Sequence, residues 1–352
     1  MSFLVGILLF AVAMQQAGIG DILKTIFLFP SLIIILVFLL NFGAICVIGS
    51  WRWKIIIEAQ NSHKVNFWKV LRAKLAGFTV SYITPSALIG GEPVRAYMIK
   101  EEIGYDWEKS FASVVIDGAI YFFSLFLLML AGFLFLINYF SLPLEFFCGF
   151  GIIVIGAVFI LYLFYSRMLN KNTDGEGFFM FIIGVLRLNK IKAIRNKEKN
   201  IKKTERIITQ FFKNKKKVFL KAFFLAILEI VFYLIVICVV IFHLRQADTA
   251  FEFIQSVPIL FLMTLANFVP IPGSLGSFEA ALTFIFELLN LGKSNGFALG
   301  LIHRFVNIIL VVIGFFILIH FELTTVSRKF SAEAPEALLK LHRFFKRIIR
   351  NN

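Results

Sequence analysis

Long apolar segments limit what this sequence can fold into more than any other feature does. Five runs consist almost entirely of hydrophobic side chains: residues 29–48, 121–137, 148–165, 218–242 and 305–319. Several approach or exceed the roughly 20 apolar residues that an α-helix needs to cross a bilayer core. Over the whole chain 59% of the residues are hydrophobic, whereas soluble domains average about 45–50%. We therefore expect an all-α, multi-pass integral membrane protein.

Basic residues are concentrated in segments that flank the apolar runs. The formal net charge is +15, and residues 167–221 contain 16 Lys and Arg residues against four acids. A second basic segment ends the chain, and a third follows Trp51, with Arg52, Lys54, Lys64, Lys69, Arg72 and Lys74. Cytoplasmic loops are enriched in Lys and Arg, so we expect these segments and both termini on the cytoplasmic side of the cell membrane. No nucleic-acid partner is expected, because the segments contain no recognisable nucleic-acid-binding module.

Segments poor in Lys and Arg complete the predicted topology. Three such connections are expected outside: residues 138–145, 244–252 and 290–296. About six spans then alternate across the membrane, near residues 3–14, 29–50, 111–137, 146–165, 218–243 and 297–320. Two apolar stretches remain, residues 70–96 and 253–289, and each has both ends on one side. We therefore expect each stretch to enter and leave the membrane on the same side, as two re-entrant hairpins from opposite faces. The irregular backbone at their tips must then be covered by protein or water.

The predicted topology divides the chain into two membrane halves and two basic cytoplasmic parts. In order these are the first half at residues 1–166, a loop at 167–217, the second half at 218–324 and an amphipathic tail at 325–352. The hairpin at 70–96 belongs to the first half and the hairpin at 253–289 to the second.

Both predicted hairpins contain a similar motif. The first reads TPSALIGGEPVR at residues 84–95, and the second reads PIPGSLGSFE at residues 270–279. In each motif a proline precedes a glutamate by seven residues: Pro85 and Glu92, then Pro272 and Glu279. A charged residue follows each glutamate 25 positions later: Asp117 in the first half and Arg304 in the second. This shared spacing predicts an inverted-topology repeat, which places broken helices and a substrate site near the mid-plane.

Proline and glycine explain why helices would stop within these motifs. Proline removes a backbone donor, and glycine permits turns that side chains forbid. The expected helix-breaking residues are Thr84, Pro85, Gly90, Gly91, Pro93, Pro270, Pro272, Gly273 and Gly276. New half-helices should begin near Pro93 and Gly276, and their free N–H groups and positive dipole ends suit an anion such as a lipid phosphate.

Five intramembrane charges are the candidate headgroup-binding residues: Glu92, Arg95, Asp117, Glu279 and Arg304. Ionisable residues inside a membrane are functional candidates by default. Structural roles remain open, with each glutamate capping its half-helix or pairing with an arginine, and Asp117 forming an ion pair. Pairing is compatible with ligand contact, because an arginine that holds a carboxylate can exchange it for phosphate. We expect Glu92, Arg95, Glu279 and Arg304 to line one polar cavity.

No cofactor or metal is expected. The cysteines Cys46, Cys148 and Cys238 lie inside apolar runs, and their spacing matches no metal site. The sequence also contains no nucleophile elbow, phosphate-binding P-loop or metal-spaced cluster of His and Asp.

The two motifs resemble those of the lysylphosphatidylglycerol synthase transmembrane-region family, also called the flippase-like domain family. The matching residues are Thr84-Pro85, Gly90 to Arg95, Pro270 to Gly273, Gly276, Glu279 and Arg304, with Trp51-Arg52-Trp53 at a span edge. Gly118 departs from the pattern, which has Arg beside the Asp, as does Ser274, where Gly is usual. Family members also occur joined to an aminoacyl-lipid synthase or a sugar transferase. The tail at residues 325–352 lacks room for such a catalytic domain, so we expect a stand-alone membrane domain.

The resemblance implies a lipid transporter, not an enzyme, that moves an anionic or modified lipid between leaflets. Membrane lipids, chiefly anionic ones, are the expected partners. One alternative is a membrane enzyme that modifies a lipid headgroup with Glu92 or Glu279 as general base. Another is an accessory subunit whose basic loop recruits a cytoplasmic lipid or glycan synthase.

Overall fold

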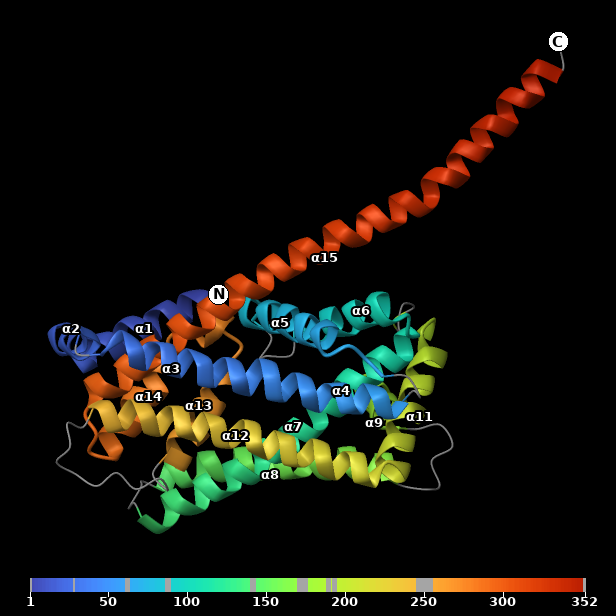
Figure 1. Cartoon of the computed structure of the whole chain (residues 1–352). Helices are drawn as coiled ribbons and strands as arrows, with labels where there is room; N and C mark the ends of the chain where they lie inside the picture. Colours follow the sequence, from blue (N-terminus) through green and yellow to red (C-terminus); the bar gives the residue numbers. More distant parts are fainter. Residues whose placement is uncertain are drawn as a thin grey trace.

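The computed structural model is a bundle of α-helices (Figure 1). It describes residues 2–27, 29–60, 64–85, 90–139, 144–169, 177–187, 191, 195–244 and 256–350. None of these residues forms a β-strand. The predicted all-α class is confirmed.

The helices of the first half are α1 (Ser2–Ala17), α2 (Ile19–Phe27), α3 (Ser31–Phe42), the π-helix η1 (Gly43–Ile48), α4 (Gly49–Gln60), α5 (Phe67–Ile83), α6 (Glu92–Ile103), α7 (Trp107–Tyr139) and α8 (Leu144–Leu169). They are followed by α9 (Phe178–Val185), α11 (Glu198–Asn214), α12 (Lys216–Leu244), α13 (Ser256–Asn267), the 3₁₀ turn η4 (Pro272–Ser274), α14 (Ser277–Leu288) and α15 (Lys293–Arg350).

Four helical stretches in the described residues are long and apolar enough to cross a membrane: Ser31–Gln60, Trp107–Asn138, Lys216–His243 and Lys293–Thr325. The pair α1 and α2 makes a fifth if it counts as one span, but it is bent by 82°. Alone, the 16 residues of α1 reach only about 24 Å, less than the roughly 30 Å of hydrocarbon. A multi-pass protein is therefore confirmed, with four or five candidate spans by length. The expected span at 3–14 falls short by itself, whereas the expected span at 146–165 lies within the 26-residue apolar helix α8.

The two predicted breaks interrupt helices where the motifs lie. The helix α5 ends at Ile83, and α6 begins at Glu92 with Pro93 in its first turn. The helix α13 ends at Asn267, and α14 begins at Ser277 after Gly276. Each pair packs together, α5 against α6 and α13 against α14, so each stretch forms a hairpin. The predicted starts of the two half-helices are confirmed, whereas residues 86–89 and 253–255 lie outside the described residues.

Gly91 allows the two arms of the first hairpin to approach closely. A Cβ atom built on Gly91 would lie 1.8 Å from the backbone oxygen of Gly77 in α5. The Gly91 N–H also donates to Ser81 Oγ at 2.9 Å. The end of α5 therefore holds the start of α6 by backbone contact, without an intervening side chain.

We expect Gly91→Ala to destabilise the protein by about 1–3 kcal/mol, because an overpacked site must shift its backbone. Gly118→Ala is the matched control, because a Cβ there meets nothing within 4 Å. The measurement is the thermal unfolding midpoint in detergent. Equal midpoints for the two variants would contradict the close packing of α5 and α6.

The basic loop at residues 167–217 contains packed helices. Ile208, Phe211 and Phe212 of α11 are buried, and α11 packs against α7, α8 and α9. Glu205 accepts backbone hydrogen bonds from Phe179 and Met180 at the start of α9. Burial raises the pKa of Glu205, while these hydrogen bonds oppose the rise.

The last helix, α15, is continuous from Lys293 to Arg350, and its final part projects away from the other helices (Figure 1). The expected tail at 325–352 is thus the continuation of a spanning helix. Within the bundle, α15 packs against α5 and α14, whereas α12 packs against α4, α7 and α13. These two groups of helices surround the candidate site.

Candidate functional site

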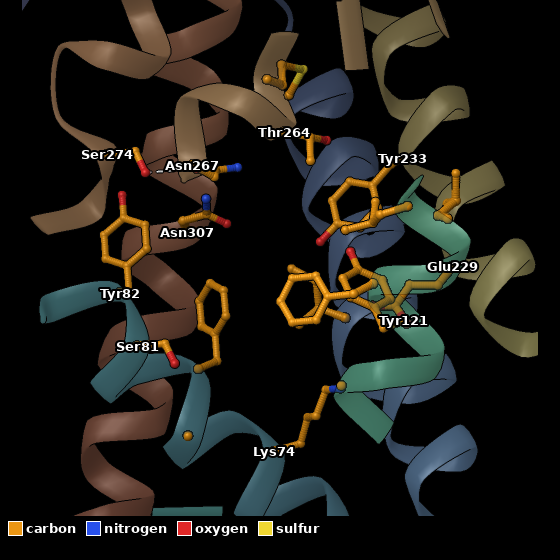
Figure 2. Close-up of a pocket in the computed structure, with 18 of the residues that line it drawn as sticks. Lys74, Ser81, Tyr82, Tyr121, Glu229, Tyr233, Thr264, Asn267, Ser274 and Asn307 are labelled. Atoms are coloured by element: carbon orange, nitrogen blue, oxygen red, sulfur yellow. Dashed lines mark hydrogen bonds between the residues drawn. The ribbon is translucent and has the colours of Figure 1, made fainter. Parts of the chain in front are cut away.

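A cavity of about 220 Å³ lies between the two groups of helices. One side of it carries the charged residues Arg52, Lys74, Glu92, Arg95, Asp117 and Glu229. Neutral polar side chains face it from the second half: Thr264, Asn267, Ser274 and Asn307 (Figure 2). Apolar residues, including Phe122 and Leu125, line the remainder. The cavity therefore combines a buried charge cluster with an uncharged polar wall.

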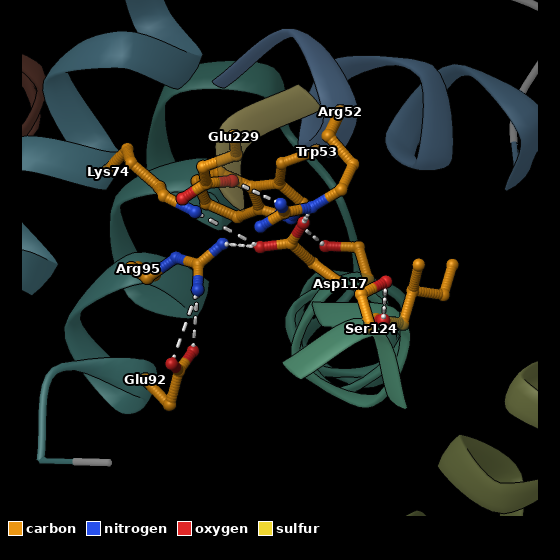
Figure 3. A network of polar contacts seen from close by, with 10 residues as sticks. Arg52, Trp53, Lys74, Glu92, Arg95, Asp117, Ser124 and Glu229 are labelled. Carbon is orange, nitrogen blue, oxygen red and sulfur yellow. Dashed lines mark hydrogen bonds and ion pairs between the residues drawn. The ribbon is translucent and has the colours of Figure 1, made fainter. Parts of the chain in front are cut away.

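Asp117 of α7 is the centre of the charge cluster (Figure 3). Its Oδ1 accepts from Arg52 Nε of α4 at 2.7 Å. Its Oδ2 accepts from Arg95 Nη2 of α6 at 2.6 Å and from Lys74 Nζ of α5 at 3.4 Å. The Asp117 side chain is 1% exposed. One carboxylate thus joins three cations from three different helices.

Arg52 links this cluster to α12 and to aromatic rings. Its Nη1 donates to Glu229, whose side chain is also buried. The Arg52 guanidinium lies 4.9 Å from the centroid of the Tyr121 ring, while Arg95 lies 4.2 Å from that of Trp53. In such cation–π contacts the guanidinium is attracted electrostatically to the face of the ring. Each of the two guanidinium groups therefore contacts carboxylates through its N–H groups and an aromatic ring through its face.

Glu92 is the most accessible acid of the cluster. Arg95 Nη1 donates to both of its oxygens, at 2.9 and 3.2 Å. The Glu92 side chain is 27% exposed, whereas those of Arg95 and Asp117 are 7% and 1% exposed. With Glu92 bound, the three cations are balanced by three acids, Asp117, Glu229 and Glu92.

Glu279 and Arg304 form a separate, closed pair. Arg304 donates to Glu279 Oε1 through Nε at 2.7 Å, and Nη2 lies 2.6 Å from the same oxygen. The Gly276 N–H donates to Oε2 at 2.8 Å. Arg304 Nη1 also donates to the backbone oxygen of Gly273 at 3.2 Å. The Glu279 carboxylate therefore caps α14, which is the structural role left open by the sequence, and Arg304 holds the turn before it.

The expectation that all four motif charges line one cavity is wrong for Glu279 and Arg304. Glu92 and Arg95 line the cavity, but Glu279 and Arg304 do not. Glu279 is fully buried, and its two carboxylate oxygens bind Arg304 and the Gly276 N–H at the start of α14. The neighbours His303 and Phe278 line the cavity instead, with their rings stacked at 4.9 Å.

The remaining motif residues form the two breaks. Thr84 is the C-cap of α5, with Pro85 after it, and Gly90 and Gly91 form the turn into α6. In the second break Pro270 and Pro272 precede Gly273, which has a φ of +58°, and Gly276 has a φ of +79°. Ser274 also has a positive φ, +50°, which is uncommon for a residue with a side chain. Its hydroxyl donates to Asn267 at 2.9 Å (Figure 2).

Three residues of the charge cluster were not among the predicted site residues: Arg52, Lys74 and Glu229. The sequence assigned Arg52 and Lys74 only to a basic segment that follows Trp51, whereas both line the cavity. A signal existed for two of them. Lys74 lies inside the apolar stretch 70–96, and Glu229 lies inside the span at 218–243.

Metal ions in proteins are bound by His, Cys, Asp and Glu side chains. Among the described residues, no group of three or more His, Cys, Asp or Glu side chains is arranged to hold a metal ion. Cys46 is buried and Cys238 is partly buried, both as free thiols.

Comparison with known proteins agrees with this membrane architecture. The family model described as "Lysylphosphatidylglycerol synthase TM region" matches residues 1–314. The chain belongs to this family. The match includes both break motifs and the entire charge cluster, so the protein is a membrane protein of a lipid-related family.

Two relatives match most of the chain. A UPF0104 membrane protein of Methanothermobacter thermautotrophicus is 23% identical over 310 residues, which covers 86% of this chain and 89% of that protein. A UPF0104 membrane protein of Methanocaldococcus jannaschii is 26% identical over 311 residues, which covers 85% and 88%. No solved structure matches the chain.

Proposed function

We propose that this protein binds an anionic or modified lipid by its headgroup in the central cavity and moves it between leaflets. The observation that carries this proposal is the pair of Glu92 and Arg95. Its acid is partly exposed and its arginine is held from behind by Asp117 and Trp53. A lipid phosphate can replace Glu92 on Arg95 Nη1 without moving the guanidinium. Arginine suits this exchange because its planar donors match phosphate and carboxylate equally well.

Charge balance supports an exchange over a simple addition. Adding an anion to the three acids and three cations of the cluster would leave one negative charge uncompensated, which is costly in a membrane interior. When Glu92 turns toward water, the phosphate takes its place and the balance is kept. Uncharged headgroup atoms would then meet the polar wall. Asn307 Oδ1 suits this role, because it is buried and has no hydrogen-bond partner among the described residues.

We also propose that the two hairpins are re-entrant and belong to an inverted repeat, with the basic segments in the cytoplasm. Support comes from the shared Pro–Glu spacing and from the helix break in each half. In such repeats, rocking of one half against the other exposes the site alternately to the two sides. Labelling from outside intact cells of a cysteine introduced near Lys199 would contradict this orientation.

The general-base alternative is disfavoured for Glu279. Its two oxygens already accept from Arg304 and from Gly276, and a general base must reach a substrate proton.

The test is leaflet exchange of labelled phosphatidylglycerol by protein reconstituted in liposomes. We expect Arg95→Gln to slow exchange by about 10- to 100-fold, since a charge-assisted hydrogen bond contributes about 1.5–3 kcal/mol. Arg95→Lys should give a smaller loss, because it keeps the charge but not the fork. Lys199→Gln and Lys216→Gln should exchange lipid normally, because these charges are exposed and screened. Normal exchange by both Arg95 variants would remove the proposed mechanism.

A further inference from the structure

A second hollow, of about 460 Å³, lies between α5, α6 and α15. We call it the α15 groove. Its polar part contains Lys69 and Arg72 of α5, Glu102 of α6 and His320 of α15, and its apolar part contains Phe316 and Ile317 of α15. None of these residues lines the central cavity.

The polar part of the groove has more positive than negative charge. Lys69 Nζ donates to the backbone oxygen of Glu102 at 2.6 Å, and Arg72 Nη2 donates to Glu102 Oε2 at 3.2 Å. Two cations therefore face one carboxylate. Arg72 Nε is buried and has no hydrogen-bond partner in the described part of the chain. The Arg72 side chain as a whole is nonetheless 43% exposed, so part of it is open to a ligand in the groove.

The groove lies where a lipid headgroup would meet the protein. Trp68, next to Lys69, is 66% exposed, and exposed tryptophans in membrane proteins gather at the membrane–water boundary. Phe316 is 67% exposed and lies one helical turn before His320, within the apolar span Lys293–Thr325. The groove is therefore polar at the boundary and apolar toward the span, which is the order of groups along a phospholipid.

From this arrangement we infer that the α15 groove is a second lipid site, which binds one anionic phospholipid. The phosphodiester contacts Arg72 and Lys69, and an acyl chain lies along Phe316 and Ile317. One phosphodiester charge matches the surplus cation, and its two free oxygens suit the arginine fork. The groove shares no residue with the central cavity, so this site does not depend on the translocation proposed above.

The test is native mass spectrometry of the full chain during titration with phosphatidylglycerol. We expect the wild-type protein to retain one tightly bound lipid that Lys69→Gln/Arg72→Gln binds at least about 10-fold more weakly, through the loss of a charge-assisted bond. Lys54→Gln/Lys100→Gln is the matched control, because it removes two cations that pair elsewhere, with Glu58 and Glu101. That variant should bind like the wild type. Equal affinity of the two double variants would overturn the inference.

Two further variants test the site without relying on the double substitution. Glu102→Gln removes the competing carboxylate and should strengthen binding of phosphatidylglycerol. Weaker or unchanged binding by Glu102→Gln would count against the site. Arg95→Gln should leave binding in the α15 groove intact, because Arg95 belongs to the central cavity. A loss of the tightly bound lipid in Arg95→Gln would assign that lipid to the cavity and overturn the inference.

Discussion

Replacing Arg52 with glutamine is expected to lower the unfolding free energy by about 3–5 kcal/mol, the usual cost of breaking a buried ion pair. Arg52 is 1% exposed and donates to both Asp117 and Glu229. Asp117 keeps Lys74 and Arg95 as partners. Glu229, by contrast, is paired only with Arg52 among the described residues. The substitution therefore leaves one buried carboxylate without a cation.

The charge balance of the cluster supplies the control for this prediction. In Arg52→Gln/Glu229→Gln, two cations face two acids, so we expect the double variant to recover part of the lost stability. Lys54→Gln should cost less than about 1 kcal/mol, since its pair with Glu58 in the same helix is partly exposed. Chemical unfolding in mixed micelles gives the free energy of unfolding of each of the three variants. A double variant less stable than Arg52→Gln would contradict the role of Glu229 as the residue left unpaired.

Features that depend on neighbouring residues could be predicted from the sequence. Proline and glycine act on their own backbone and on the adjacent turn, so the half-helix starts near Pro93 and Gly276 followed directly from the motifs. The apolar runs likewise indicated the multi-pass class, since span length depends on consecutive residues. The sequence did not show that the first apolar segment is divided into α1 and α2, which are bent by 82°.

Partner choice across the bundle was not encoded in any local pattern. Arg52 pairs with Asp117, 65 residues away, and with Glu229, 177 residues away. A basic residue beside Trp51 at a span edge has the same sequence signature whether it faces water or turns inward. Only the packing of α4 against α7 and α12 places Arg52 inside. The sequence therefore identified Asp117 and Arg95 as candidates but not Arg52 and Lys74, the other two cations around Asp117.

The two halves use the same motif spacing for different purposes. In the first half, the residue 25 positions after Glu92 is Asp117, an acid that attracts Arg95 and leaves Glu92 at the cavity. In the second half, the residue 25 positions after Glu279 is Arg304, which binds Glu279 directly. A reversal of sign at one position thus distinguishes a pair with a partly exposed glutamate from a pair with a fully buried one. We therefore expect the second motif to support the fold rather than to contact the lipid.

Glu279→Ala should accordingly destabilise the protein by about 3–5 kcal/mol. It removes the acceptor for the Gly276 N–H, and a lost cap alone costs about 1 kcal/mol. It also leaves Arg304, whose side chain is 16% exposed, without its carboxylate. Glu287→Ala in the same helix is the matched control. Its pair with Lys293 is solvent-exposed and should contribute less than about 1 kcal/mol.

Leaflet exchange measured per folded molecule separates this structural role from a functional one. For Glu279→Gln, which keeps an acceptor oxygen for the Gly276 N–H, we expect a smaller loss of stability and nearly normal exchange of phosphatidylglycerol. Arg95→Gln should show the opposite pattern, with slow exchange in protein that remains folded. The two arginine–glutamate pairs would then differ in function as they differ in exposure. The Glu92 side chain is 27% exposed and can turn toward water, whereas that of Glu279 is fully buried. A Glu279→Gln protein that is as stable as the wild type but does not exchange lipid would show that the second pair contacts the lipid after all.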